Sequence, residues 1–290
     1  MKMVFPTFGD DRLRCVNGDM RWIENPSIRT RRFLNLPELT AYRELIVFLA
    51  VRDLKVRYKL PAFGLTWAVL QPLAGAAVIT FVFRKLAGVP SDGIPYFAYA
   101  FLGFVIWSYF TSTLSAVTES LVSNAGLVTK IYFPRLVAPL AAVLPGLLDM
   151  SVAFVGVAVV MVVLGIAPGL ALLTLPIWVA ALCLVVLGLG LIFATVNVLY
   201  RDALYAYGLI VQLLFFASPL AYPSTLIQGG WRYLYHLNPM VAVFDGFRWS
   251  VLGGHPPAPQ AIISLLSGLL ILGAGLRYFT ATERRFADVI

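Results

Sequence analysis

The chain has 290 residues, of which 60% are hydrophobic and 12% are charged, and its formal net charge is +8. A soluble domain cannot bury so large an apolar fraction, so these figures exclude an ordinary soluble globular protein. Most of the chain is therefore expected to lie in lipid, and its function is expected to be carried out in or across a bilayer.

The first segment, residues 1–36, is polar and rich in arginine, with Pro6, Gly9, Gly18 and Pro26 breaking any regular pattern. We predict a cytoplasmic tail of weak order. Nucleic-acid binding is one explanation for a basic tail. Charge next to membrane spans more often sets topology or contacts anionic lipid, so we expect membrane lipid and no nucleic acid as its partner.

Residues 37–60 are predicted to form an amphipathic helix. Pro37 suits the first turn of a helix, and from Glu38 to Lys59 apolar residues recur at helical spacing while charged residues fill the other face. The segment carries too many charges to span a bilayer, so we expect it to lie in the cytoplasmic membrane interface. A helix packed on a soluble partner would show the same pattern, and both interpretations can hold together.

The remainder, residues 61–290, is predicted to be a single domain that spans the membrane six times. Each of its long apolar stretches is close to the ~20 residues that a helix needs to cross a bilayer. The stretches run over residues 62–83, 94–118, 138–165, 171–199, 205–222 and 260–281. The predicted fold class is therefore an all-α integral membrane protein.

The charge distribution predicts the orientation. With six spans both termini lie on one side of the membrane, and that side then carries eighteen of the 22 Lys and Arg residues, against four on the other. Cytoplasmic segments carry the excess of Lys and Arg, so both termini are expected in the cytoplasm.

Two connecting segments differ from ordinary loops. Residues 120–137, between the second and third spans, are charged and cytoplasmic, and they include Asn124, Lys130 and Arg135. Residues 223–258, between the fifth and sixth spans, are too rich in Pro and Gly to span yet are strongly aromatic. Stretches of that kind lie at the membrane surface or dip back into it.

Asp149 lies about midway along the third span and is the clear intramembrane charge. Ionisable groups at that depth are costly and are functional candidates. The alternatives are a hydrogen bond to a neighbouring helix or subunit and a direct transport role. An ion-coupled carrier would offer more such groups, so the energy source is expected outside this chain.

The second span is crowded with aromatic residues, and Tyr99, Trp107 and Phe110 approximate one face of it. Sugars present apolar ring faces to aromatic surfaces, so this stripe can line a pore for glycan. An ordinary packed or lipid-facing helix would show the same composition.

Signatures of catalysis are missing from the sequence. It contains no G-x-x-x-x-G-K-[ST] loop for nucleotide, no Cys/His spacing for a metal and no Ser/His/Asp set. We expect no enzyme activity and no cofactor bound by this chain.

Several short motifs together resemble a known family. They are Arg52 through Lys59, Gly64, Trp67, Gln71-Pro72-Leu73, Asn124, Lys130 through Arg135, Tyr200-Arg201-Asp202, Ser218-Pro219, Asn238-Pro239, Arg248 and Phe286 through Ile290. Their order around six spans resembles the transmembrane subunit of type-2 ABC exporters for polysaccharide and polyol phosphate, which export O antigen, capsule and teichoic acid. The turn at Leu60-Pro61-Ala62-Phe63 departs from the Thr- or Ser-containing turn of many members.

The resemblance implies a homodimer in the bacterial inner membrane that works with two cytoplasmic ATPase subunits, which would hold ATP and Mg²⁺. It also implies that 120–137 contains a helix that couples to the ATPase, with Asn124, Lys130 and Arg135 as its contacts, and that 223–258 forms re-entrant gate helices. The expected substrate is a lipid-linked polysaccharide. Its anionic lipid carrier should meet Arg52, Lys55, Arg57 and Lys59 at the cytoplasmic surface, although these cations can equally bind bulk anionic lipid.

Two rival functions remain. A teichoic acid, small-molecule or drug exporter of the same superfamily would share every feature above. A membrane-embedded glycosyl or lipid transferase would need polar catalytic residues clustered where a loop meets the membrane, and the sequence offers no such cluster.

Overall fold

The computed structural model describes residues 14–16, 19–21, 36–59, 66–128, 133–200, 203–283 and 286. The chain divides into two units, Met1–Asn35 and Leu36–Ile290. In the first unit β1 (Arg14–Val16) pairs antiparallel with β2 (Asp19–Arg21), with Cys15 opposite Met20. Most of the predicted tail, together with Lys130 and the Arg201-Asp202 turn, lies outside the described residues.

Every described element of the second unit is helical, as the predicted fold class requires. In chain order the elements are α1 (Leu36–Ala41), α2 (Arg43–Tyr58), α3 (Trp67–Ile79), the π-helix η3 (Thr80–Leu86), α4 (Tyr96–Ser123), α5 (Ala125–Val128), α6 (Val137–Leu164), the 3-10 helix η4 (Leu170–Thr174), α7 (Leu175–Leu199), α8 (Ala203–Ala217), the 3-10 helix η5 (Ser224–Leu226), α9 (Trp231–Tyr235), α10 (Pro239–Leu252) and α11 (Ala261–Thr282).

Five helical stretches within the described residues are long and apolar enough to cross a membrane: 67–86, 96–127, 137–164, 170–199 and 261–282. The third, fourth and sixth predicted spans agree with these bounds within one residue, because runs of apolar residues are a local property of the sequence. The stretch at the first predicted span begins at residue 67 in place of 62, and the stretch at the second ends at residue 127 in place of 118. The predicted fifth span corresponds to α8, an apolar helix of 15 residues. At 1.5 Å per residue α8 is about 22 Å long, which is shorter than a ~30 Å hydrocarbon core.

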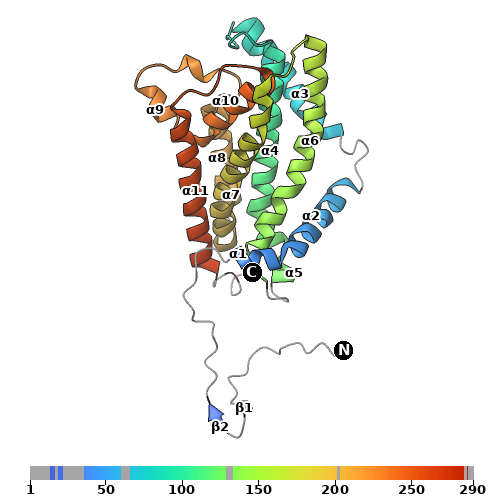
Figure 1. Cartoon of the computed structure of the whole chain (residues 1–290), viewed down its shortest axis with the longest axis vertical. Coiled ribbons are helices and arrows are strands. Elements are labelled where there is room, and N and C mark those ends of the chain that lie inside the picture. Colours follow the sequence, from blue (N-terminus) through green and yellow to red (C-terminus); the bar gives the residue numbers. More distant parts are fainter. Residues whose placement is uncertain are drawn as a thin grey trace. The chain divides into compact units, whose positions relative to one another are not determined.

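The helix α4 runs through the middle of the bundle between α6 and α7 (Figure 1). Most of its length is buried inside the chain, including Phe101, Phe110 and Leu114. The other long helices keep many apolar side chains exposed, among them Val162 and Val163 on α6. An apolar exterior around an aromatic core is the pattern expected for a bundle that meets lipid on its outside.

The close packing of α7 on α11 depends on two glycines. A Cβ atom on Gly275 would lie 2.3 Å from the carbonyl oxygen of Gly188, and a Cβ on Gly188 would lie 2.7 Å from the backbone nitrogen of Leu272. Small residues of this kind let two helix backbones approach within a membrane. This contact fixes the sixth predicted span against the fourth.

Both ends of the second unit reach the same end of the bundle. Leu49 of α2 packs with Phe133 and Val137 at the start of α6. Phe279 and Phe286, at the C-terminal end of α11, pack with Ala138 of the same turn of α6. We call this the α1/α2 end (Figure 1).

The opposite end, called the α9/α10 end, is organised by Asn238. Its side-chain oxygen accepts a hydrogen bond from the Met240 backbone nitrogen at 3.0 Å, which caps α10, and Pro239 fills the first helical position. The Asn238 amide also donates to the Ala217 carbonyl at 3.0 Å and to the Ser218 hydroxyl at 3.1 Å. The Ser-Pro and Asn-Pro motifs of the sequence therefore join the end of α8 to the start of α10.

The segment 223–258 contains three short helices, η5, α9 and α10, in place of one long one. Within it α10 is almost wholly buried, with Val241, Phe244 and Phe247 inside the core. It packs against α4, α7, η4 and α11. The Pro and Gly residues that break this stretch in the sequence are the reason it forms short helices.

Candidate functional site

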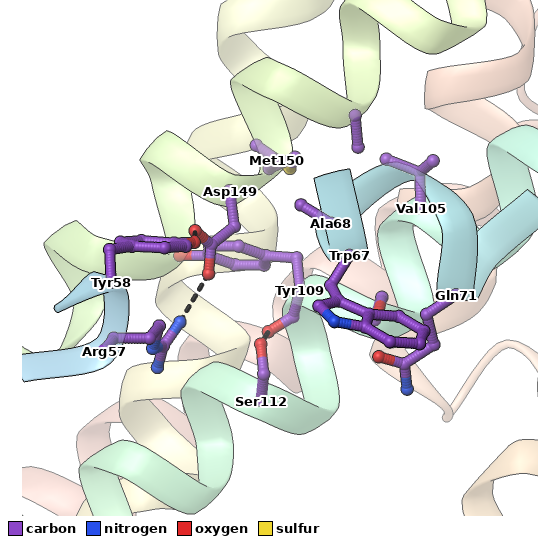
Figure 2. Close-up of a pocket in the computed structure, with 12 residues that line it drawn as sticks. Arg57, Tyr58, Trp67, Ala68, Gln71, Val105, Tyr109, Ser112, Asp149 and Met150 are labelled. Atoms are coloured by element: carbon purple, nitrogen blue, oxygen red, sulfur yellow. Dashed lines mark hydrogen bonds and ion pairs between the residues drawn. The ribbon is translucent and has the colours of Figure 1, made fainter. Parts of the chain in front are cut away.

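A cavity of about 310 Å³ opens where the end of α2 meets α3, α4 and α6. We call it the Arg57 cavity. Figure 2 shows how four separate segments contribute to it, with Arg57 and Tyr58 from α2 pointing toward Asp149 of α6. Its described lining residues are Arg57, Tyr58, Trp67, Ala68, Gln71, Val105, Ser108, Tyr109, Ser112, Asp149, Met150 and Ala153.

Asp149 has two partners in this cavity. The Nη1 of Arg57 forms an ion pair with its Oδ2, and the hydroxyl of Tyr58 donates a hydrogen bond to its Oδ1. The side chain of Asp149 is 20% exposed and that of Arg57 is 36% exposed. The intramembrane carboxylate is therefore held by a neighbouring helix, which is one of the two alternatives that the sequence left open.

Burial, followed by the hydrogen bond to Asp149, raises the pKa of Tyr58 to about 12. The hydroxyl therefore keeps its proton and stays a donor throughout the neutral range. Tyr58 and Arg57 together present two donors to one carboxylate, which compensates its charge in a partly buried place.

The ion pair sets the course of α2. Asp149 follows Val137 by twelve residues, or about 18 Å along α6 at 1.5 Å per residue. Since Leu49 packs at the start of α6 and Arg57 pairs at Asp149, α2 rises along the first half of α6. A helix lying flat on the membrane surface would contact only the first turns of α6. The location of α2 in the membrane interface stays a prediction.

The other walls of the cavity are amphipathic. The hydroxyls of Ser108 and Ser112 come from α4, the amide of Gln71 comes from α3, and the half-exposed Trp67 covers one side. Such walls offer hydrogen bonds to a polar ligand and a flat apolar surface beside it. The cavity can therefore receive a polar or anionic group that enters from the side of the bundle.

The four predicted entrance cations do not form one cluster. Only Arg57 lines the cavity. Arg52 binds the Asp53 carboxylate, with its Nη2 at 2.7 Å, and the same Nη2 donates to the Asn124 side-chain oxygen at 2.7 Å. Lys55 and Lys59 are exposed. Their role at a substrate entrance stays a prediction.

The residues predicted to couple to an ATPase make contacts inside this chain. Asn124 is buried at the end of α4, where its amide donates to the Ser120 carbonyl at 2.8 Å and its oxygen receives Arg52. Arg135 donates to the Glu283 carbonyl, and its guanidinium lies 5.8 Å from the Phe286 ring centroid. Lys130 lies outside the described residues, and coupling by the three stays a prediction.

The predicted channel aromatics are packed inside one chain. Tyr99, Trp107 and Phe110 are 1%, 8% and 0% exposed. The Trp107 ring lies 5.1 Å from Phe110 and 5.4 Å from Phe215 of α8. The guanidinium of Arg248 of α10 lies over the Tyr99 ring, so these rings would line a channel only if α8 and α10 moved away from α4, and their channel role stays a prediction.

The sequence analysis missed Tyr58, Gln71 and the serines of α4 as parts of this site. Tyr58 follows Arg57 directly, but nothing local in the sequence marks it as a partner of a residue 91 positions away. Ser108 and Ser112 do carry a signal, since they are polar residues four apart on an apolar span and so share one face of the helix.

Comparison with known proteins adds a family and several relatives. The sequence model of the ABC-2 type transporter family matches residues 44–252. An O-antigen export system permease protein RfbA of Klebsiella pneumoniae is 28% identical over 248 residues, which cover 85% of this chain and 95% of that protein. The permease of the same name from Myxococcus xanthus is 28% identical over 264 residues, which cover 87% of this chain and 98% of that one.

Proposed function

We propose, from the premise that this chain belongs to the ABC-2 type transporter family, that it is the membrane subunit of an ATP-driven exporter of a lipid-linked, O-antigen-like polysaccharide. Membership of that family makes it a transporter permease rather than an enzyme. The observation that carries the substrate class is its similarity, over nearly their whole length, to permeases named for O-antigen export.

The topology that we propose has six spans with both termini in the cytoplasm. The start of α2 and the end of α11 both pack on the first turns of α6, and an even number of crossings is what places two ends on one side. In that topology α8, extended by residues 218–222, is the fifth span, and 223–258 forms the gate helices. The excess of Lys and Arg at the α1/α2 end supports a cytoplasmic location for it.

The assembly that we propose contains two copies of this chain and two ATPase subunits. The chain carries no nucleotide-binding motif, so ATP and Mg²⁺ would be held by the partner subunits. The region around 120–137 is the proposed contact with the ATPase, because it lies at the α1/α2 end and its described residues join that end to α2 and to the end of α11.

The Arg57 cavity is the proposed entry point for the anionic head of the lipid carrier. It lies on the side of the bundle, some distance from the α1/α2 end. The guanidinium of Arg57 points into the cavity because it forms an ion pair with Asp149. A phosphate can bind the guanidinium in place of the carboxylate, since both anions can offer two oxygens to the planar fork of arginine and phosphate brings more negative charge. The half-exposed Trp67 would then lie beside the first sugar or the lipid chain.

Deletion of the gene in the bacterium that carries it tests the proposed function. We expect surface polysaccharide to disappear while lipid-linked polysaccharide accumulates inside the cell, and the intact gene to restore export. Loss of polysaccharide on both sides would indicate a role in synthesis. Normal surface polysaccharide together with sensitivity to small toxic molecules would indicate a drug exporter, and either result would contradict the proposal.

A further inference from the structure

A second cavity, of about 200 Å³, lies at the α9/α10 end of the bundle. We call it the Arg248 cavity. It is lined by residues of α4, α9, α10 and η5 together with the loops around Asp92 and residues 254–258. Thr225 and His255 are exposed at its edge, whereas Tyr99 and Arg248 are buried in its floor, so the cavity has an open side and a closed bottom.

Arg248 of α10 is the buried cation of this cavity, with only 4% of the residue exposed. Its guanidinium carbon lies 3.5 Å from the centroid of the Tyr99 ring, and its Nη2 donates to the Leu220 carbonyl at 2.9 Å. Gly103 of α4 makes room for this arrangement, since a Cβ there would lie 3.2 Å from the Leu220 oxygen and 3.4 Å from Nη2. The fold therefore fixes the position of the guanidinium.

Several polar atoms in the same cavity have no partner in the part of the chain that the structure describes. They are Nε and Nη1 of Arg248, Nε of Arg232 and the hydroxyl of Tyr99. Each of the four can donate a hydrogen bond, and the three arginine nitrogens can do nothing else. Buried polar groups in proteins nearly always have partners, so four unmet donors around one cavity call for an acceptor from outside the chain.

The carboxylates in the cavity do not supply that acceptor. The hydroxyl of Ser224 donates to Asp245 Oδ2 at 2.6 Å, and the hydroxyl of Thr225 donates to Asp92 Oδ1 at 3.1 Å. Among the described residues neither carboxylate forms an ion pair with Arg248. Burial raises the pKa of Asp245, whereas the hydrogen bond from Ser224 and the nearby charges of Arg248 and Arg232 act in the opposite direction.

Water alone would not complete the site. A water molecule can accept from one or two of these donors, but it brings no negative charge to a buried guanidinium that forms no ion pair among the described residues. A carboxylate or a phosphate supplies several acceptor oxygens, matches the planar fork of arginine and carries the opposite charge. The cavity, at about 200 Å³, is smaller than the roughly 300–1,000 Å³ of pockets for drug-sized ligands, so it suits a small charged group.

We infer that the Arg248 cavity is an oxyanion-binding site that takes a single carboxylate or phosphate group between Arg248, Arg232 and the Tyr99 hydroxyl. The binding chemistry is independent of the proposed export function. Its place in export, as a contact for an acidic group of the emerging chain or of a lipid on the extracytoplasmic side, rests on that function.

The test is binding of small oxyanions to the purified full-length chain in nanodiscs of zwitterionic phosphatidylcholine. The probes are inorganic phosphate and glucuronate, with glucose as the neutral match for glucuronate and chloride at equal ionic strength as the salt control. The readout is the rise in melting temperature with ligand concentration, from which Kd follows. We expect phosphate and glucuronate to stabilise the protein in a saturable manner, and glucose and chloride not to.

Three variants identify the site. Arg248→Gln should weaken binding by about tenfold or more, because it removes the charge and the two unmet guanidinium donors. Asp245→Asn should strengthen binding, because it removes a negative charge from the same cavity, and a merely structural role would not produce opposite effects. Arg84→Gln is the control, since Arg84 is exposed on η3 outside this cavity and should bind like the unaltered chain.

Equal binding by the unaltered chain and Arg248→Gln would overturn the inference, as would equal effects of glucuronate and glucose. Should Arg248→Gln fail to fold, Tyr99→Phe takes its place, because it removes one unmet donor and leaves the ring that supports Arg248. Tyr99→Phe should weaken binding severalfold, and no change would count against the site. Failure of either kind would leave the proposed export function untouched.

Nanodiscs that also contain anionic phosphatidylglycerol distinguish two sources of the oxyanion. If a lipid head group enters the cavity, these discs raise the melting temperature of the unaltered chain but not of Arg248→Gln, and added phosphate has little further effect. If the natural ligand is a soluble or glycan-borne group, phosphate acts equally in both kinds of disc. Either result supports an oxyanion site, and stabilisation by the anionic lipid that Arg248→Gln retains would contradict it.

Discussion

The two arginines of the two cavities are placed in opposite ways. Arg57 is more than one-third exposed and has its counter-charge, Asp149, within the chain. Arg248 is almost wholly buried, and its guanidinium contacts the rings of Tyr99 and Phe244 and the Leu220 carbonyl, while two of its donor nitrogens have no described partner. The fold thus provides a counter-charge for Arg57, which solvent can reach, and leaves hydrogen-bond donors of the enclosed Arg248 without partners among the described residues. This difference indicates that the two arginines have different functions.

A paired cation near the surface can exchange its partner, because solvent and ligand both reach it and because breaking the pair costs little. An unpaired cation in a closed pocket is positioned to bind one kind of ligand. Its unmet hydrogen-bond donors lower the stability of the fold until that ligand binds. This difference suits a site of transient entry at the α1/α2 end and a site of fixed binding at the α9/α10 end.

The largest effect is expected at the paired site. Asp149→Asn and Arg57→Gln should each lower the free energy of unfolding by about 1–2 kcal/mol, which is below the 3–5 kcal/mol of a fully buried pair because solvent screens both groups. The double variant should lose about 1 kcal/mol less than the sum of the single losses. Denaturant unfolding in mixed micelles measures all three, and strictly additive losses would show that the pair does not interact.

Removing the second donor to Asp149 should have a somewhat smaller effect. Tyr58→Phe deletes the hydroxyl that hydrogen-bonds the carboxylate and keeps the ring, so we expect a loss of about 1 kcal/mol in the same unfolding measurement. The matched comparison is Tyr42→Phe at the start of α2, because Tyr42 does not line the Arg57 cavity. Equal losses in the two variants would mean that the Tyr58 hydroxyl adds nothing to the pairing of Asp149.

Alkaline pH should reveal the same hydroxyl. The pKa of Tyr58 is raised from 10.0 to about 12 in the folded chain, so the folded state holds this proton more tightly than the unfolded state does. The resulting stability is fully present below pH 10 and is lost as the pH rises through 12. The unaltered chain should therefore lose more stability between pH 10 and 12 than Tyr58→Phe. Parallel pH profiles of the two proteins would rule out this linkage.

The smallest effect is expected for the matching change at the unpaired site. Tyr99→Phe removes a buried hydroxyl that has no described partner, so in the absence of any oxyanion the free energy of unfolding should stay the same or rise by a few tenths of a kcal/mol. Together with a loss of stability in Tyr58→Phe, this result would confirm that the Tyr58 hydroxyl forms a stabilising hydrogen bond within the chain and that the Tyr99 hydroxyl does not. A loss of about 1 kcal/mol or more would show that Tyr99 has a partner inside the fold.

The sequence predicts the long helices well and the sites poorly, for a physical reason. Apolar runs are local features, so the positions of most of the long helices could be predicted within a few residues. The pairing of Arg57 with Asp149 joins residues 92 positions apart and depends on the angle at which α2 meets α6. The lack of a counter-charge at Arg248 is even harder to predict from the sequence. It depends on how Gly103, Leu220 and Tyr99 surround the side chain in three dimensions.

The aromatic residues of α4 illustrate the same limit. Helical spacing puts Tyr99, Trp107 and Phe110 near one face, but spacing does not say what covers that face. In the structure α8 and α10 of the same chain cover it, through Phe215 and Arg248. A sequence can therefore place residues on one side of a helix without saying whether that side faces a channel or a core.

The most direct test of the account is stimulation of the ATPase by lipid-linked polysaccharide, measured on the reconstituted complex of this chain with its ATPase. Arg57→Gln is compared with Arg43→Gln, an exposed arginine at the start of the same helix that does not line the cavity. We predict that Arg57→Gln loses most of the stimulation while basal turnover is nearly unchanged, and that Arg43→Gln keeps both. Equal stimulation of the two variants would contradict the claim that the substrate enters at the Arg57 cavity.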